Sequence, residues 1–196
     1  MRRSAEPLDR TRTTNEASVH DPCRGIPSRS HIEQQFRHAN VWVPSRDTGV
    51  DLLVSDRRNR RAVSLQVKFS KDFLVTHMGP VFQKDLRSCG WWTIDQNKLR
   101  DSPADFWVFV LHGFARRTID FVIVPPRELW RRLRFIHGSQ KMIQSYLWVT
   151  EGRQCWETRG LQRKDQLRIT DGTYRVQKRE FTRWLNEWGP VARLNK

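Results

Sequence analysis

Two apolar runs near the middle of the chain restrict the fold more than any other feature. They are DFWVFVLHG at 105–113 and IDFVIVP at 119–125, both rich in Val and Phe and closed by Gly113 and Pro125. Continuous apolar runs of this length predict strands that are buried on both faces. Such strands need other layers packed against them, so the sequence predicts an α/β fold with a central sheet flanked by helices.

Further strands and helices are expected around these two runs. Pro126 begins a predicted helix in PRELWRRLRFIHG and Gly138 ends it. Upstream, a short helix in HIEQQFRHA precedes three predicted strands. These strands are VWV at 41–43 and the segments 49–55 and 62–69.

The remaining segments carry weaker patterns. A helix is expected within 79–88, and YLWVTEGRQCWET predicts a hairpin that turns at Glu151–Gly152. REFTRWLNEWGP, ending at Gly189–Pro190, has apolar residues at helical spacing and predicts an amphipathic helix packed on the sheet.

The chain divides by composition into three parts. Residues 1–27 are polar, contain Pro and Gly, and show no apolar periodicity, which predicts a flexible arm. Residues 28–138 contain the predicted sheet and form the expected core. Residues 139–196 are interpreted as a basic α+β extension that packs on this core.

The charge balance favours a polyanionic partner. Lys and Arg number 36 against 21 Asp and Glu, which gives a net charge of +15, and nine tryptophans offer stacking surfaces. No apolar run reaches the roughly 18 residues of a membrane helix, and the basic start lacks the apolar stretch of a signal peptide. We therefore expect no membrane partner and a cytoplasmic protein, with association with the nucleoid as one option. Three scattered cysteines give no metal-binding spacing and no disulfide framework.

Polar residues interrupt the two apolar strands of GVDLLVSDRRNRRAVSLQVKFS, residues 49–70. Alternate residues of a strand share a face, so Gln66 and Lys68 point the same way, and Asp51 approaches both if the strands pair as a hairpin. A buried carboxylate needs a partner or a metal ion. Two alternatives follow: an ion pair between Asp51 and Lys68, or a divalent cation at Asp51.

The metal alternative assigns a role to each nearby group. Asp51 would supply a carboxylate, Gln66 its amide oxygen and Val67 its backbone carbonyl to Mg²⁺ or Mn²⁺. Lys68 would orient the attacking water or neutralise charge on the phosphate. Glu33, on the preceding helix, is a candidate outer ligand.

These residues resemble the catalytic core of the restriction-endonuclease-like nucleases, the PD-(D/E)xK superfamily. The resemblance rests on Glu33, on GVDLLV with Asp51, and on LQVKFS with Gln66 and Lys68. The later ADFWVFVL and DFVIVPPREL are similar to the strand–strand–helix finish of its Holliday-resolvase-like members. Two departures are Val50, in place of the motif's proline, and Gln66, in place of its second acid.

The resemblance implies a mixed central sheet and a Mg²⁺-dependent enzyme that hydrolyses phosphodiester bonds in DNA. The alternative is a catalytically inactive DNA-binding module with the same fold. Nucleases of this kind that cut both strands often act as dimers, so a homodimer is one option. The residues expected to bind nucleic acid are Arg57, Arg58, Arg60, Arg61, Lys71, Arg131 and Arg134.

Overall fold

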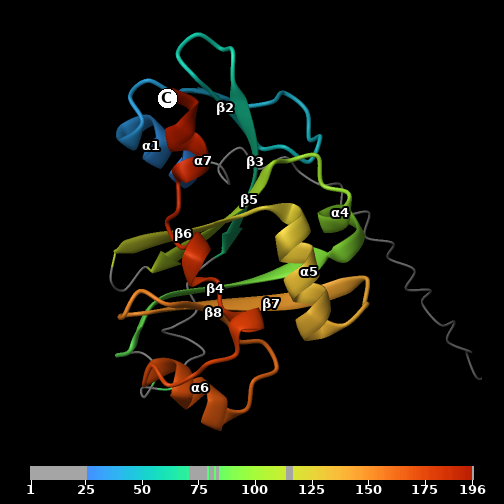
Figure 1. Cartoon of the computed structure of the whole chain (residues 1–196), viewed down its shortest axis with the longest axis vertical. Helices are drawn as coiled ribbons and strands as arrows, with labels where there is room; N and C mark the ends of the chain where they lie inside the picture. The colour runs from blue at the N-terminus through green and yellow to red at the C-terminus, as the bar shows by residue number, and fades with distance from the viewer. Residues whose placement is uncertain (1–25, 71–78, 80–81, 83, 114–116, 196) are drawn as a thin grey trace, which may run out of the picture.

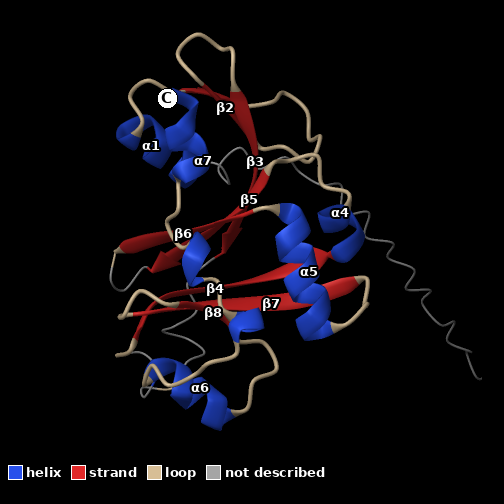
Figure 2. Cartoon of the chain, in the orientation of Figure 1, coloured by secondary structure: helices blue, strands red, loops and turns tan. Residues whose placement is uncertain are grey.

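The centre of the protein is a mixed five-stranded sheet with helices against it, as the apolar runs predicted (Figures 1 and 2). The structure, a computed structural model, describes residues 26–70, 79, 82, 84–113 and 117–195. Strands β3 and β5 run parallel, and all other neighbours in this sheet are antiparallel. In spatial order the strands are β1 (Asn40–Trp42), β2 (Leu52–Ser55), β3 (Ala62–Ser70), β5 (Phe106–Gly113) and β6 (Thr118–Val124).

A second, antiparallel sheet joins the middle of the chain to its C-terminal part. Its order is β4 (Leu86–Asp95), β7 (Met142–Thr150) and β8 (Cys155–Glu157). β4 lies between β3 and β5 in the sequence but pairs along its whole length with β7. The boundary expected at residue 138 therefore falls between two segments that share this sheet.

Helices cover both faces of the central sheet. Ile32 and Val191, from the two helices on one face, share a buried cluster with Leu65 and Val67 of β3. On the other face, Phe109 packs with Leu133 of α5 and with residues of the second sheet. The helices are α1 (Ile26–Gln35), α4 (Gln96–Arg100), α5 (Pro126–His137), α6 (Arg163–Thr170) and α7 (Gly189–Ala192).

Alternation along β3 decides which residues reach these two layers. Leu65 and Val67 point to the α1 side, so Gln66 and Lys68 point to the side of the second sheet. Each fully buried leucine or valine contributes roughly 1.5–3 kcal/mol relative to an exposed one, which fixes the register of the strand. The core thus places the polar residues of β3 between the two sheets.

The amphipathic helix predicted for REFTRWLNEWGP is wrong. The 3₁₀ turn η2 (Gln177–Arg179) ends at the first residue of this segment, which itself contains only the 3₁₀ turn η3 (Thr182–Trp184) and the start of α7. A further 3₁₀ turn, η4 (Arg193–Asn195), follows α7. The backbone amide of Asn186 donates to Phe121 O at 2.6 Å, and Asn186 Oδ1 accepts from the Phe121 amide at 2.8 Å. β6 is an edge strand whose backbone N–H and C=O groups need hydrogen-bond partners, so the segment pairs with it instead of forming a helix. Trp184 and Trp188 are buried nonetheless.

Three other expectations have different outcomes. The helix expected within 79–88 is wrong over its last residues, because Leu86–Ser88 belong to β4, and part of its start lies outside the described residues. The helix from Pro126 is confirmed, and Gly138 follows its last residue with a φ of 75°. The hairpin that turns at Glu151–Gly152 is confirmed by the pairing of β7 with β8.

None of the helices in the described ranges combines the length and the apolar character that crossing a membrane requires. The arm predicted for residues 1–27 lies almost entirely outside the described residues.

Candidate functional site

The predicted meeting of Asp51 with the polar residues of β3 is present in the structure. Asp51 lies directly before β2, and its backbone amide donates to Leu65 O at 2.8 Å, which sets the hairpin register. Asp51 Oδ2 accepts a hydrogen bond from Gln66 Nε2 at 2.5 Å and another from the backbone amide of Val67 at 2.6 Å. Two neutral donors thus hold the carboxylate of Asp51 against β3.

This carboxylate lies in a cleft of about 730 Å³ between the two sheets. Asp51, Gln66, Val67 and Lys68 line its wall on the central sheet. The opposite wall comes from β4, α4 and the start of β7, including Thr93, Asp95, Lys98 and Met142. Asp95 is held in place by capping α4, because its Oδ1 accepts from the amide of Asn97 at 2.8 Å.

Lys68 lines the same cleft without pairing with Asp51. Its ammonium lies 5.2 Å from the centre of the Trp107 ring, in the range of a cation–π contact. Among the described residues Asp51 forms no ion pair, so the alternative of an Asp51–Lys68 pair is wrong. The reason is the register: the carboxylate points at the amide groups of Gln66 and Val67, and Lys68 leans along Trp107.

Glu33 is not brought to this cleft. It is exposed and pairs with Arg29, one turn earlier in α1, at 2.8 Å. Its neighbour Ile32 packs on the face of the sheet that carries Leu65 and Val67, opposite to Gln66. The expected role of Glu33 as an outer metal ligand is therefore a wrong prediction, because the sheet separates it from Asp51.

The remaining groups form a set of oxygen ligands suited to a small divalent cation. Asp51 lines the cleft, and its Oδ1 accepts no hydrogen bond from the described part of the chain. Rotation of the Gln66 amide turns its Oε1 toward the same space, since amide oxygen and nitrogen have the same shape. The Val67 carbonyl points to the same strand edge as its amide. One carboxylate, other oxygens and retained water are a usual Mg²⁺ site.

The set is nevertheless poor in charge. Within the described ranges, no three His, Cys, Asp or Glu side chains are grouped so that they could hold a metal ion. A site built on Asp51 therefore has a single carboxylate, with Gln66 as a neutral ligand.

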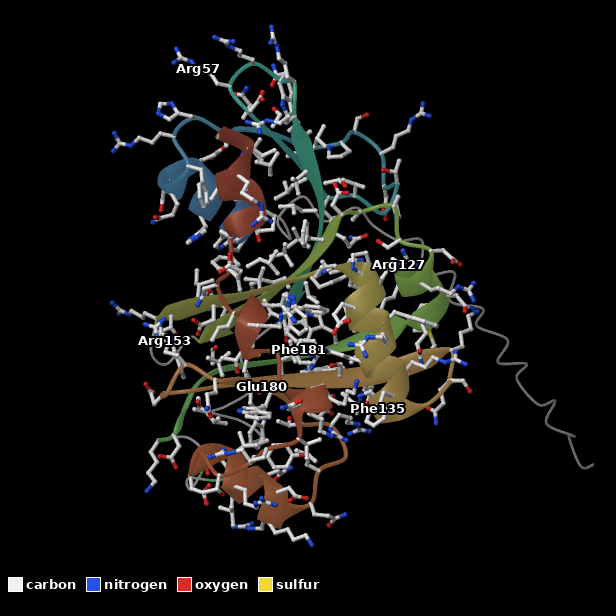
Figure 3. The ribbon with its side chains drawn as sticks, viewed as in Figure 1. Arg57, Arg127, Phe135, Arg153, Glu180 and Phe181 are labelled. Atoms are coloured by element: carbon white, nitrogen blue, oxygen red, sulfur yellow. The ribbon has the colours of Figure 1, made fainter. Side chains whose placement is uncertain are left out.

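The basic turn between β2 and β3 holds three of the predicted nucleic-acid residues at the surface. Asp56 Oδ1 accepts from the amides of Arg58 at 3.1 Å and Arg60 at 2.9 Å. The hydrogen bond from the Arg60 amide is the main reason why the pKa of Asp56 is lowered. Arg57, Arg58 and Arg60 are exposed, and Arg57 extends outward at the tip of the turn (Figure 3).

The other predicted contacts have different surroundings. The guanidinium of Arg61 donates to the carbonyl of Leu194, so it ties the turn to the C-terminal segment. Arg131 pairs with Glu128 at 2.7 Å, and Arg134 lies 5.4 Å from the centre of the Trp130 ring. Both lie on α5, and neither lines the cleft. Lys71 lies outside the described residues.

The wall formed by β4 and α4 was missed in the sequence. TIDQNK at 93–98 covers the end of β4 and the start of α4, and it contains five polar residues, Thr93, Asp95, Gln96, Asn97 and Lys98. This polar run was the available signal, but nothing local in it indicates that β4 leaves the central sheet.

No family model matches this chain, and no curated protein and no solved structure matches it.

Proposed function

We propose that this protein is a Mg²⁺-dependent nuclease that hydrolyses phosphodiester bonds in DNA, with a core of the restriction-endonuclease-like type. One observation carries the proposal. The carboxylate of Asp51, the amide of Gln66 and the backbone of Val67 meet in a cleft that Lys68 also lines. This function implies a cytoplasmic protein that works in contact with DNA.

The topology around these residues supports the same interpretation. An antiparallel hairpin carries Asp51 at its start and Gln66 and Lys68 on its second strand, and that strand then pairs in parallel with β5. The polar residues of β3 face an open cleft, while the alternate residues of that strand are buried under α1. A strand with polar residues in the cleft on one face and buried apolar residues on the other suits a catalytic role.

The side chains around the cleft have distinct tasks in this mechanism. Mg²⁺, when bound, stabilises negative charge on the phosphate and lowers the pKa of water. Asp51 would hold the ion through Oδ1, with Gln66 Oε1 and the Val67 carbonyl as neutral ligands. The ammonium of Lys68, steadied by Trp107, offsets charge that builds up on the phosphate and orients the attacking water.

Binding of DNA rests on the positive charge of the chain. Arg57, Arg58 and Arg60 extend from the same hairpin that carries Asp51 and are free to meet phosphates at the surface. Each phosphate neutralised gives a slope of about −0.9 in a plot of log affinity against log salt concentration. We expect the triple Ala variant of these arginines to flatten this slope.

Nicking of supercoiled plasmid tests the proposal directly. We expect wild-type protein to nick plasmid with Mg²⁺ or Mn²⁺, EDTA to stop the reaction, and Lys68→Ala to abolish it. Lys164→Ala is the matched control, because it removes one exposed positive charge on α6, away from the cleft. Intact plasmid with both metals, at protein concentrations that bind the DNA fully, would contradict the nuclease function.

A second function, a DNA-binding module without catalysis, is favoured by one detail. Gln66 stands where the related nucleases carry an acid, and in this structure its amide donates to Asp51 rather than facing away from it. The contact satisfies the carboxylate without any ion. Gln66→Glu separates the two functions: in a nuclease it adds a ligand charge and strengthens dependence on Mg²⁺, whereas in an inactive module it only places two carboxylates together and lowers stability.

A further inference from the structure

Within the described part of the chain, one face of the second sheet is covered at one end only. On this face, the end near α6 is covered by a buried cluster that includes Trp148, Trp156 and Ile169. Beyond it, β4 and β7 place three outward pairs side by side: Trp91 with Tyr146, Thr93 with Gln144, and Asp95 with Met142. Trp91, on the edge strand β4, is 45% exposed, and Met142, the first residue of β7, is 50% exposed.

This surface continues from the candidate catalytic cleft. A second hollow, of about 400 Å³, shares Thr93 and Met142 with the cleft and ends at Arg159. The described residues that line this hollow include His137 and Arg159, and none of them is acidic. The carboxylates Asp47, Asp51, Asp95 and Asp101 all lie at the cleft end. The groove thus has an acidic end and a basic end.

Arg159 is held in place at the basic end. Its guanidinium lies 5.1 Å from the centre of the Tyr146 ring and donates to the Tyr146 hydroxyl at 3.4 Å. Two hydrogen bonds hold its backbone: its amide donates to buried Glu157 at 3.3 Å, and its carbonyl accepts from Arg179 at 3.0 Å. The charged head of Arg159 is exposed, so the scaffold presents it to an anion.

We propose that this groove and the sheet face beside it hold an unpaired segment of the nucleic acid, with a base stacked on Trp91, next to the groove, and a phosphate on Arg159, at its end. The inference rests on the proposed function and adds its substrate class: DNA with a single-stranded stretch next to the cleavage site. A duplex hides the faces of its bases, whereas an unpaired base stacks on an exposed indole. The net charge of +15 disfavours a second copy of the chain as the occupant of a surface that ends in a fixed arginine.

Binding without cleavage tests this inference apart from the nuclease function. The probe is a fluorescein-labelled oligothymidylate of about 12 nucleotides, a length within the range of single-strand binding folds, measured by anisotropy in EDTA. Trp91→Ala should weaken binding at least about 5-fold, the effect of losing one base stack. Trp91→Phe should restore most of the affinity. Trp91→Ala should weaken binding of a blunt duplex of the same length less than it weakens binding of the single strand.

Phe135→Ala is the matched control. Phe135 is 68% exposed on α5 rather than on the second sheet, and it lies far from the basic turn that carries Arg57 (Figure 3). Its truncation should leave single-strand affinity unchanged. Arg159→Ala is the second variant should Trp91→Ala fold poorly, and it should weaken the same probe and reduce the salt slope by about one phosphate.

Three outcomes would overturn the inference. One is equal affinity of Trp91→Ala, Arg159→Ala and Phe135→Ala for the oligothymidylate. Another is an equal loss with blunt duplex, which would mean that no unpaired base is involved. The third is a wild-type dimer in sedimentation that Trp91→Ala dissociates, which would assign the surface to a second copy.

The two proposals fail separately. Trp91-dependent binding without any nicking of plasmid would uphold this inference and remove the nuclease. Plasmid nicking by wild type, together with a single-strand affinity that Trp91→Ala does not change, would uphold the nuclease and remove this inference.

Discussion

Two aspartates of the central sheet, one beside β3 and one on β6, differ in what neutralises them. Asp120, on β6, is fully buried and accepts from Arg87 at 3.1 Å, Ser88 at 2.8 Å and Asn186 at 3.1 Å. Asp51 accepts from Gln66 and from the Val67 amide, and no described cation pairs with it. One negative charge is cancelled inside the protein, and the other is left open to a cleft.

Glu157 follows the pattern of Asp120. It is fully buried, and it contacts Arg179 at 2.7 Å and His137 at 3.0 Å. An unpaired charge in the interior costs several kcal/mol, so a scaffold carboxylate comes with its own cation. The difference teaches how to recognise a functional carboxylate in this protein: it is well positioned by neutral donors while its charge stays available to an ion from solvent.

The largest expected effect comes from removing the charge of Asp51. Asp51→Asn keeps an oxygen that accepts from Val67 but removes the anionic ligand, so plasmid nicking should fall by about 100-fold or more. Its free energy of unfolding should stay the same or rise, because an uncompensated charge disappears. A drop in the unfolding free energy of Asp51→Asn would contradict this prediction and would mean that Asp51, like Asp120, serves to stabilise the fold.

Removing the charge of Asp120 should have the opposite profile. Asp120→Asn leaves Arg87 without its anion in a largely buried position, and we expect the free energy of unfolding to drop by about 2 kcal/mol. Urea denaturation measures this loss. Nicking per folded molecule should remain. Asp105→Asn, an exposed carboxylate that accepts from the Ser64 amide and hydroxyl at 2.8 Å each, is the control and should change stability much less.

Magnesium itself should stabilise the protein by a smaller amount. A ligand that binds only the folded state adds about 1.4 kcal/mol at a free concentration near ten times its Kd. We expect Mg²⁺ to raise the thermal midpoint of wild type and to leave Asp51→Asn unmoved, whereas Asp120→Asn should keep the response. An identical shift in all three proteins would indicate binding elsewhere.

The smallest expected effect is an acid sensitivity that belongs to the scaffold. His31 stacks on Trp188, with ring centres 5.2 Å apart, and burial lowers the pKa of its imidazole. The unfolded chain then binds a proton more readily, so stability is complete above pH ~6.5 and declines as the pH falls toward the lowered value. His31→Gln should narrow the difference in unfolding free energy between pH 7.5 and pH 5, and the exposed His38→Gln should leave it as in wild type.

Much of the fold was readable because local pattern and tertiary burial agree. The runs at 105–113 and 119–125 are apolar on both faces and became β5 and β6, buried between α1 and the second sheet. Pro126 and Gly138 set the ends of α5 through backbone geometry alone. The segment after residue 178 was misread because its apolar spacing fits a helix, while the decisive partner was the open edge of β6.

The candidate site was predictable only on one side. Asp51, Gln66 and Lys68 lie on a hairpin, so alternation along two adjacent strands was enough to bring them together. Glu33 failed because sequence distance gives no indication of which face of a sheet a helix covers. The opposite wall depends on pairing between β4 and β7, about 50 residues apart, which no local pattern encodes.

The excursion of β4 also bears on the order in which the molecule assembles. β3 and β5 are direct neighbours in the central sheet, yet β4, which lies between them in the sequence, belongs to the second sheet. The partner of β4 there, β7, is synthesised later. Pairings that close long loops form slowly. We expect the hairpin bearing Asp51 to form early in refolding and the facing wall to close last, so that a kinetic intermediate would already hold the ligand residues while lacking the enclosure around them.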